Sequence, residues 1–467
     1  MFKKFLLHLV SVISLFLAVT IQAQHQVLTL KAAVDSAVAN YGTIKAKVEY
    51  IKASRSSLTQ SRREYLPDLN LSAQQDYGTI NGQVGPLYGF RGLSASSAGP
   101  PLPTQNWNSA FGALYLANIE WNFFSFGRVR ERINLAKFEL ERDENDLEQE
   151  VFQHKIRVAA AYLNLLAAQR LSGSWQNNLA RASGLRDVVV TRTRNGLNAG
   201  VDSSLANAEV SSAKIALVRA RDFEQEQSNQ LAIFMGTTKQ EFLLDSIFLN
   251  RIPTSISDLA GRKITDHPTL RFNRSLVSLS SGQERFLRTF YYPTFSLFGI
   301  IQTRGSGFRY NYGDQYPDAF TGKYLEGVAP RRANYVTGIG MIWNITSSLR
   351  LQQQIASQRF TSKGLQFEYE LVDQQLKNQL LLAERKIQNA MENYQEAPVQ
   401  VKAAGDAYNQ KSVLYKNGLS TIIDITQALY TVNRAETDRD IAFSNVWQAL
   451  LLKAAALGDF GYFINEF

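Results

Sequence analysis

Apolar positions recur at alternating spacings of four and three through a proline-free stretch of the chain, residues 128–194. The two series, which run side by side, comprise Leu147, Val151, His154, Val158, Ala161 and Leu165, and Phe152, Ile156, Ala159, Leu163 and Leu166. Four-three spacing is typical of coiled coils. Because the two series lie about 100° apart on the helix, each side of the helix contacts a different neighbour. The pattern predicts a helical rod, on the order of 100 Å long, within an assembly of helices.

Four shorter segments show a different pattern, in which apolar and polar positions alternate. In the first of them, Leu69, Leu71 and Ala73 alternate with polar neighbours, and aromatic residues are frequent in the others. Alternation with a period of two predicts β-strands with one apolar and one polar face. The predicted strands cover about residues 69–79, 111–123, 294–303 and 334–345. This pattern fits a soluble sandwich, with the apolar face inward, and equally an outer-membrane barrel, with the apolar face toward lipid.

The same elements occur twice along the chain. The repeated segments, at offsets of 222 to 226 residues, are Tyr65-Leu66-Pro67 with Tyr291-Tyr292-Pro293, Ile119-Glu120-Trp121-Asn122 with Met341-Ile342-Trp343-Asn344, and Arg194-Asn195-Gly196-Leu197 with Lys416-Asn417-Gly418-Leu419. A repeat with a long period means that one structural unit is used twice. We therefore predict a first repeat over residues 24–246 and a second over residues 247–467.

Each repeat is predicted to contain a strand pair, a long helix and a returning helix, and a further helix precedes the first strand pair. The predicted long helices span residues 128–195 and 347–417, and the predicted returning helices span residues 203–235 and 421–457. Proline cannot donate the backbone hydrogen bond of a helix interior, so Pro398 is expected to kink or break the second long helix. A long loop rich in Gly, Pro, Ser, Asn and Tyr joins the strands of each pair.

The N-terminal segment has the layout of a secretory signal peptide. Lys3 and Lys4 precede an apolar run, residues 5–19, and small or polar residues follow at Ala23 and Gln24. The apolar run is shorter than the roughly 20 residues that a membrane-spanning helix needs. We predict a signal peptide over residues 1–23, and therefore an exported protein.

Composition excludes several classes of site. The chain has no cysteine, so it has neither disulfides nor a lipid on an N-terminal cysteine, and its 4 histidines are scattered. A net charge of +9 with both signs interspersed does not form a nucleic-acid stripe. Gly338-Ile339-Gly340 lacks the third glycine of a dinucleotide loop, and Ser211-Ser212-Ala213-Lys214 lies inside a predicted helix without the other motifs of penicillin-recognising enzymes. We expect no catalytic site, no cofactor and no metal centre.

Four strands are too few to close a barrel across a membrane, and open sheet edges are not tolerated in lipid. Either several copies of the chain share their strands in one barrel, or the strands do not lie in a membrane.

The ordered and duplicated motifs resemble those of the TolC family of outer-membrane efflux proteins. The resemblance covers nearly the whole mature chain and includes both Tyr-Leu-Pro or Tyr-Tyr-Pro steps into a strand, Phe126-Gly127-Arg128 and both Asn-Gly-Leu turns. It implies an α + membrane β fold: a trimer with one 12-stranded outer-membrane β-barrel, continued by an α-helical coiled-coil barrel in the periplasm of a Gram-negative bacterium. The implied function is the exit duct of a tripartite efflux or type I secretion system, with passive conduction. The implied partners are a second and third copy of the chain, a periplasmic membrane-fusion adaptor, and an inner-membrane transporter of the RND, ABC or MFS type.

The resemblance places the helix-hairpin turns at the tip of the tunnel, where the adaptor binds. Gly196, Leu197, Gly418 and Leu419 are the candidate docking residues. Asn-Gly is also what a helix C-terminus uses for a left-handed cap, so an ordinary capped loop without a partner is the alternative.

The family also places a pore constriction just beyond these turns. Asp424, Asp202 and Tyr415 match positions that hold or line it, and three copies of Asp424 around a narrow axis would attract cations. Ser420 stands where the family pattern has an arginine, and Gln427 where it has a second aspartate, so the closed state is expected to be held differently. The alternative is that Asp202 and Asp424 serve as N-caps or first-turn acids of the returning helices.

A secreted structural coiled coil, such as a surface scaffold without a transport role, is the competing function. It explains the export signal and the rods but not the four amphipathic strands between them. The exported cargo is not readable from the sequence, although 4 Met and no Cys argue against a route dedicated to soft metals.

Overall fold

The computed structural model describes residues 27–82, 99, 101–245, 247–253 and 266–466 of the chain. The predicted signal peptide, residues 1–23, lies outside the described residues. The chain divides into two compact units, and each unit draws on both predicted repeats. A helical unit comprises the segments Met1–Ile51, Arg142–Ser275 and Leu365–Phe467, and a sheet unit comprises Lys52–Glu141 and Leu276–Gly364.

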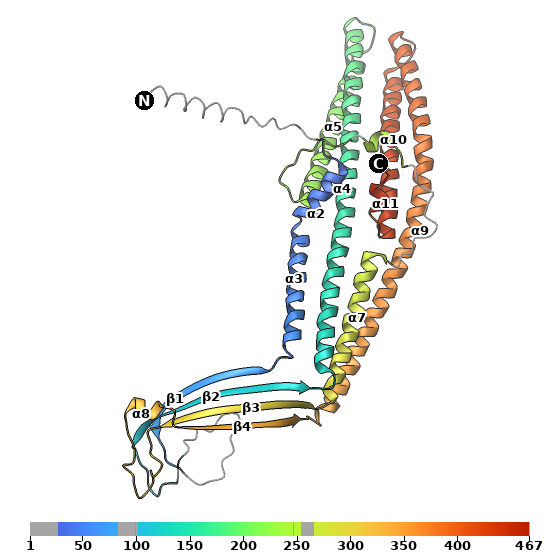
Figure 1. Ribbon diagram of the computed structural model, residues 1–467. Helices are drawn as coiled ribbons and strands as arrows, with labels where there is room; N and C mark the ends of the chain where they lie inside the picture. Colours follow the sequence, from blue (N-terminus) through green and yellow to red (C-terminus); the bar gives the residue numbers. More distant parts are fainter. Residues whose placement is uncertain (1–26, 83–98, 100, 246, 254–265, 467) are drawn as a thin grey trace, which may run out of the picture. The chain divides into compact units, whose positions relative to one another are not determined.

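The sheet unit contains one antiparallel sheet of four strands. They are β1 (Asp68–Thr79), β2 (Ser109–Phe124), β3 (Thr294–Ser306) and β4 (Arg332–Ile342), in the order β1-β2-β3-β4 (Figure 1). Two strands come from each half of the chain, and β2 pairs directly with β3 across the repeat boundary. The sheet therefore has two edges, β1 and β4, and the described residues of this chain close neither of them.

The register divides the sheet into two faces of different polarity. Leu71, Ala117, Ile301 and Tyr335 lie opposite one another across all four strands. Their neighbours Ser72, Leu116, Gln302 and Asn334 make up the next row, on the other face. Leu71 and Tyr335 are each 79% exposed and Ile301 is 61% exposed, so the apolar face lies uncovered in the single chain. The alternation in the sequence predicted these two faces.

The same contact anchors a strand end in both halves of the sheet unit. The indole N–H of Trp121 donates to the carbonyl of Tyr65 at 2.8 Å, and that of Trp343 donates to the carbonyl of Tyr291 at 3.1 Å. Between β2 and the following helix, Phe126 and Gly127 adopt positive φ angles of 47° and 84°. This left-handed step turns the chain from the strand into the helix within two residues.

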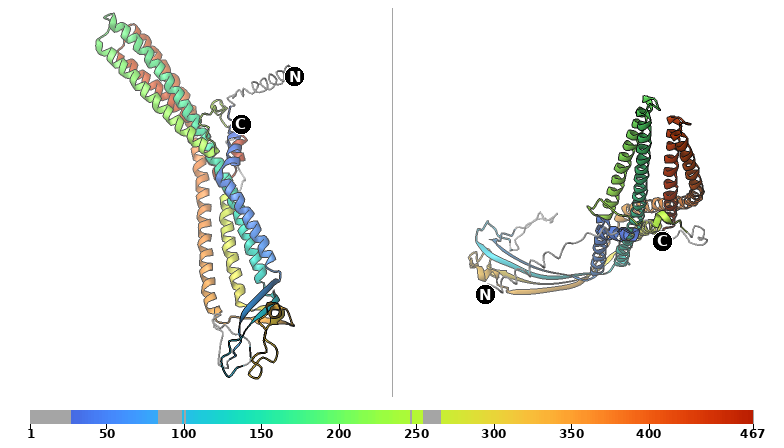
Figure 2. Two further views of the ribbon diagram at one scale, coloured as in Figure 1. Left: turned by 90° about the vertical axis from the view of Figure 1, so that its left-hand side faces the viewer. Right: turned by 90° about the horizontal axis from the view of Figure 1, so that it is seen from above.

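The described helices range from 4 to 70 residues in length. Their bounds are α2 (Leu30–Asn40), α3 (Gly42–Arg63), α4 (Arg128–Arg194), α5 (Gly200–Met235), α6 (Ile247–Asn250), α7 (Pro268–Arg288), α8 (Tyr324–Val328), α9 (Ser347–Lys416), α10 (Ile422–Leu457) and α11 (Gly461–Ile464), with a 3₁₀ turn at Thr289–Tyr291. In the helical unit, α4 with α5 and α9 with α10 form two helical hairpins (Figure 2). Of the two outcomes expected at Pro398, the break is wrong, because α9 continues through this residue, and the kink stays a prediction. In the part of the chain that the structure describes, none of the helices combines the length and the apolar character of a transmembrane helix.

The core of the helical unit follows the four-three pattern of the sequence. Val158, Ala161 and Leu165 of α4 are at most 4% exposed and pack with Trp447 and Leu450 of α10 in one apolar cluster. Tyr162 belongs to this cluster and forms hydrogen bonds to two chain segments that lie outside the helices. Its hydroxyl donates to the carbonyl of Leu28 at 2.8 Å and accepts from the N–H of Asp245 at 3.0 Å. Burial raises the pKa of Tyr162 to about 12, so this phenol stays neutral.

Candidate functional site

The turns of the two helical hairpins have the same backbone structure. Gly196 and Gly418 adopt φ angles of 73° and 76°. In the first turn, the N–H of Leu197 donates to the carbonyl of Arg192 at 2.9 Å and that of Gly196 to the carbonyl of Thr193 at 3.0 Å. These two bonds define a Schellman cap, which satisfies carbonyls at the end of α4.

The second turn repeats both hydrogen bonds. The N–H groups of Leu419 and Gly418 donate to the carbonyls of Leu414 and Tyr415, at 2.9 Å and 3.1 Å. The predicted left-handed caps at the Asn-Gly steps are thus confirmed. Each cap also presents a leucine to solvent: Leu197 is 66% exposed and Leu419 is 74% exposed.

Tyr415 and Asp202 lie in one polar network, and Asn198 joins them. The side-chain amide of Asn198 donates to the Tyr415 hydroxyl at 3.1 Å and to the Asp202 carboxylate at 2.8 Å. Burial, and next the negative charge of Asp202, raise the pKa of Tyr415, so the phenol remains protonated. The structure thus brings together two of the three residues predicted for the constriction, one from each hairpin.

Arg192 completes this network and links the hairpins directly. Its Nε–H donates to the Asn198 side-chain oxygen at 2.9 Å, and its Nη1 donates to the backbone carbonyl of Lys416 at 2.6 Å. The guanidinium also lies 5.7 Å from the centre of the Tyr415 ring. The carbonyl of Lys416 is at the end of α9, where the helix dipole favours a cation. Arg192 therefore serves as a C-terminal partner for a helix of the other hairpin.

Asp424 lies in a separate arrangement at the start of α10. Its carboxylate accepts from the backbone N–H and the hydroxyl of Thr421 at 3.1 Å and 2.9 Å, and the Thr421 hydroxyl accepts from the Asp424 N–H at 3.2 Å. The hydroxyl of Ser420 donates to the same carboxylate at 3.0 Å, and the Lys411 ammonium lies 3.7 Å from it. Hydrogen bonds from Thr421, and then from Ser420, lower the pKa of Asp424, so it is ionised near neutral pH.

Asp424 is thus the acidic member of a capping box, as the alternative interpretation of the sequence expected. Asp202 is different, although it occupies the same place in the first turn of α5. The N-cap residue there, Ala199, has no side-chain hydrogen bond, and the carboxylate of Asp202 accepts from Asn198 instead.

A row of polar contacts continues along the hairpins away from the turns. Arg181 of α4 donates to both carboxylate oxygens of Glu436 on α10, at 3.1 Å and 2.6 Å, and to Asn433 at 2.7 Å. Asn433 in turn donates to Asn178, and these two amides are 7% and 2% exposed. Because buried polar groups need their partners, this row fixes the position of α4 against α10.

Sequence reasoning missed Arg192, Asn198 and the row around Arg181. A usable signal lay in the repeat itself. Positions 222 residues apart carry the same residue at the Asn-Gly-Leu turns, but Arg192 corresponds to Leu414 and Asn198 corresponds to Ser420. Arg192 and Asn198 depart from the repeat in this way, and both contact the other hairpin.

Two helical hairpins with capped turns, joined to an antiparallel sheet of two strand pairs, define the fold of outer-membrane channels. The outer-membrane channel OprN has a TM-score of 0.73 and 15% sequence identity, over 93% of this chain and 90% of that chain. The outer membrane protein VceC of Vibrio cholerae has a TM-score of 0.71 and 17% identity, over 92% of this chain and 96% of that chain. For the CmeC outer membrane channel of Campylobacter jejuni the TM-score is 0.74 and the identity 14%, over 92% of this chain and 85% of that chain.

The family model of the outer membrane efflux proteins matches residues 33–237, most of the first repeat. The match to the outer membrane efflux proteins agrees with the resemblance that the duplicated motifs predicted, and the solved channels share the fold over 92–93% of the chain. Proteins of this family are channels of the outer membrane and not enzymes. No curated protein sequence matches the chain.

Proposed function

We propose that three copies of the chain form the exit duct of a tripartite efflux or type I secretion system in the outer membrane. One observation carries the trimeric part of this proposal: the four-stranded sheet has an exposed apolar face and two edges, β1 and β4, that no described residue of the chain closes. Each edge presents unpaired backbone groups, which lipid does not tolerate. If β1 of one copy pairs with β4 of the next, three copies close a barrel of twelve strands with its apolar face toward lipid.

The polar face of the sheet then lines a water-filled lumen, and the helical hairpins continue the duct into the periplasm. Conduction is passive, since an inner-membrane transporter of the RND, ABC or MFS type supplies the energy. The chain itself forms the path for the solute. It also forms the constriction that closes this path, which opens when the periplasmic adaptor binds.

The hairpin turns are the proposed contact with a periplasmic adaptor. Leu197 and Leu419 are exposed on two rigid caps that share one backbone geometry. An exposed leucine on a rigid turn favours an apolar contact with a partner helix. Gly196 and Gly418 hold these turns, because only glycine adopts their positive φ angles without strain.

Closure is proposed to depend on the network between the two turns. Arg192, Asn198 and Tyr415 tie one hairpin to the other within a single chain, and separating the hairpins breaks their hydrogen bonds. Asp424 is held by its capping box on the exposed side of the second turn. In a trimer its three copies would form a single ring of negative charge, because Gln427 does not add a second one.

Fractionation of cells that express the full chain tests the assembly. We expect the protein in the outer-membrane fraction and expect its extraction to require detergent. In detergent, light scattering should give the mass of a trimer. The competing scaffold function predicts extraction with high salt or urea and no detergent requirement. A detergent-free monomer would contradict the duct outright.

A further inference from the structure

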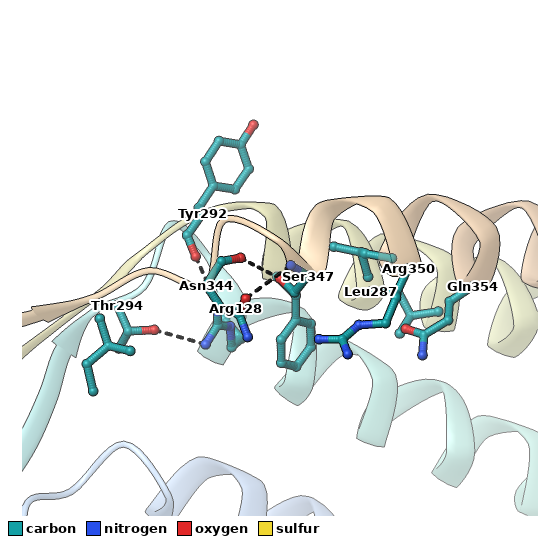
Figure 3. A pocket seen from close by; sticks show the side chains of 11 residues that line it. Arg128, Leu287, Tyr292, Thr294, Asn344, Ser347, Arg350 and Gln354 are labelled. Carbon is teal, nitrogen blue, oxygen red and sulfur yellow. Dashed lines mark hydrogen bonds between the residues drawn. The ribbon is translucent and has the colours of Figure 1, made fainter.

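A pocket of about 480 Å³ lies in the sheet unit where β3 and β4 meet the helices (Figure 3). Residues of α4, α7 and α9 line it together with the strand ends. Two of the lining residues, Arg128 and Arg350, are cationic, and none is acidic. The contacts of these two arginines determine what the pocket can bind.

Arg128 is a half-buried cation whose hydrogen-bond partners are all neutral. Its guanidinium donates to the hydroxyl of Thr294 at 2.9 Å and to the carbonyls of Tyr292 and Thr289 at 3.2 Å and 3.4 Å. It also lies 4.4 Å from the centre of the Phe290 ring. Within the described ranges Arg128 forms no ion pair, and its buried Nε–H has no acceptor. These contacts fix the guanidinium in place but leave its charge without a counter-ion.

Arg350 adds a second positive charge to the same pocket. It lies in the first turn of α9, is exposed, and points toward Arg128 in Figure 3. Across the part of the chain that the structure describes, it too forms no ion pair. Glu284, one turn before the pocket-lining Leu287 on α7, is held by Arg288 at 2.6 Å and Arg359 at 3.5 Å. The nearby acid therefore does not neutralise the pocket.

We propose that this pocket binds the phosphate group of an anionic solute. Guanidinium groups present paired donors that match phosphate oxygens, and the hydroxyls of Thr294 and Ser347 line the same space. The ring of Phe290 and the side chain of Leu351 supply an apolar wall for the remainder of the solute.

The register of the sheet indicates where such a solute comes from. Thr294 pairs with Ile342, whereas the apolar face at this level carries the next pair, Phe295 and Met341. The pocket residues of β3 and β4 therefore lie on the face that is proposed to line the duct. This assignment rests on the proposed function, because the duct delivers the solute to the pocket.

Calorimetric titration of the purified full-length protein in detergent with inorganic pyrophosphate tests the proposal. We expect pyrophosphate to bind, and Arg350→Gln to weaken binding about tenfold or more, since one charge-assisted contact is lost. Arg331→Gln is the matched control, because it removes the same charge from the exposed residue just before β4, at the strand end opposite the pocket, and should leave binding unchanged. Arg350 is exposed, so its replacement leaves the packing of the sheet unit intact.

A second titration, with phosphatidylglycerol in mixed micelles, separates a solute from a lipid headgroup. Binding of phosphatidylglycerol that depends on Arg350, without binding of pyrophosphate, would overturn the solute assignment. Absent pyrophosphate binding, or equal binding by the Arg350 variant, would overturn the site itself. Single-channel conductance of the same preparation reports on the duct independently, so a conducting protein that does not bind pyrophosphate refutes only the pocket.

Discussion

The two hairpin turns share one backbone but differ in the side chains around it. The pairs related by the repeat are Arg192 with Leu414, Thr193 with Tyr415, Asn198 with Ser420, and Ala199 with Thr421. In the first turn, the side chains of Arg192 and Asn198 donate hydrogen bonds to the second hairpin. In the second turn, the Tyr415 hydroxyl accepts from Asn198, and Thr421 caps the returning helix α10. The two copies of the repeat therefore carry complementary side chains at their turns.

Arg192→Gln should loosen the closed arrangement of the hairpins. The substitution removes the hydrogen bond from the guanidinium to the Lys416 carbonyl and the cation beside the Tyr415 ring. Because the site is partly exposed, we expect a loss on the order of 1 kcal/mol, which shifts the population of open channels several-fold. Conductance of the purified protein in planar bilayers should rise accordingly.

Arg194→Gln is the control for this experiment, since Arg194 lies in the same helical turn and is exposed. Equal conductance of the Arg192 variant, the Arg194 variant and the parent protein would show that the network does not hold the duct closed.

Local signals were sufficient to predict most helices and strands. Period-two alternation predicted the two faces of β1 and β2, and each Asn-Gly step predicted a left-handed cap. Both features depend only on residues that are neighbours in sequence. Pro398 shows where local reasoning fails: α9 continues through it despite the lost hydrogen bond, as packing along a 70-residue helix outweighs one proline. Arg192 and Asn198 were missed for another reason. Their partners are more than 200 residues away in sequence, so only the folded hairpins reveal the contact.

The returning helices α5 and α10 differ in how they begin, and this difference is testable. Thr421 caps α10 through its hydroxyl, whereas Ala199, at the equivalent position of the repeat, gives α5 no side-chain cap. Thr421→Ala should cost about 0.5–2 kcal/mol of stability. Ala199→Thr should stabilise α5 by up to about 1 kcal/mol, because the backbone at Ala199 is already extended, with φ −67° and ψ 149°.

Thermal unfolding followed by far-ultraviolet circular dichroism measures both effects, and the two variants should move the midpoint in opposite directions. A shift in the same direction for both would mean that the hydroxyl at this position does not act as a cap.

The proposed duct depends on a sheet edge that the described part of a single chain leaves open. In one chain β2 and β3 separate β1 from β4, which places the two edges roughly 14 Å apart at about 4.8 Å per strand. A disulfide needs α-carbons within about 4.4–6.8 Å. A cysteine in β1 and a cysteine in β4 can therefore join only if they belong to different copies, and the chain has no native cysteine to interfere.

Pairing Leu71→Cys with a cysteine at one of four β4 positions on the same face scans the register between copies. These positions are Ala333, Tyr335, Thr337 and Ile339. We expect one pair to oxidise efficiently and to give covalent dimers and trimers on a non-reducing denaturing gel, because strand pairing has a single register where one face is apolar. Each cysteine alone should remain monomeric on that gel. If none of the four pairs crosslinks in outer membranes, β1 and β4 of neighbouring copies do not meet, and the shared barrel must be abandoned.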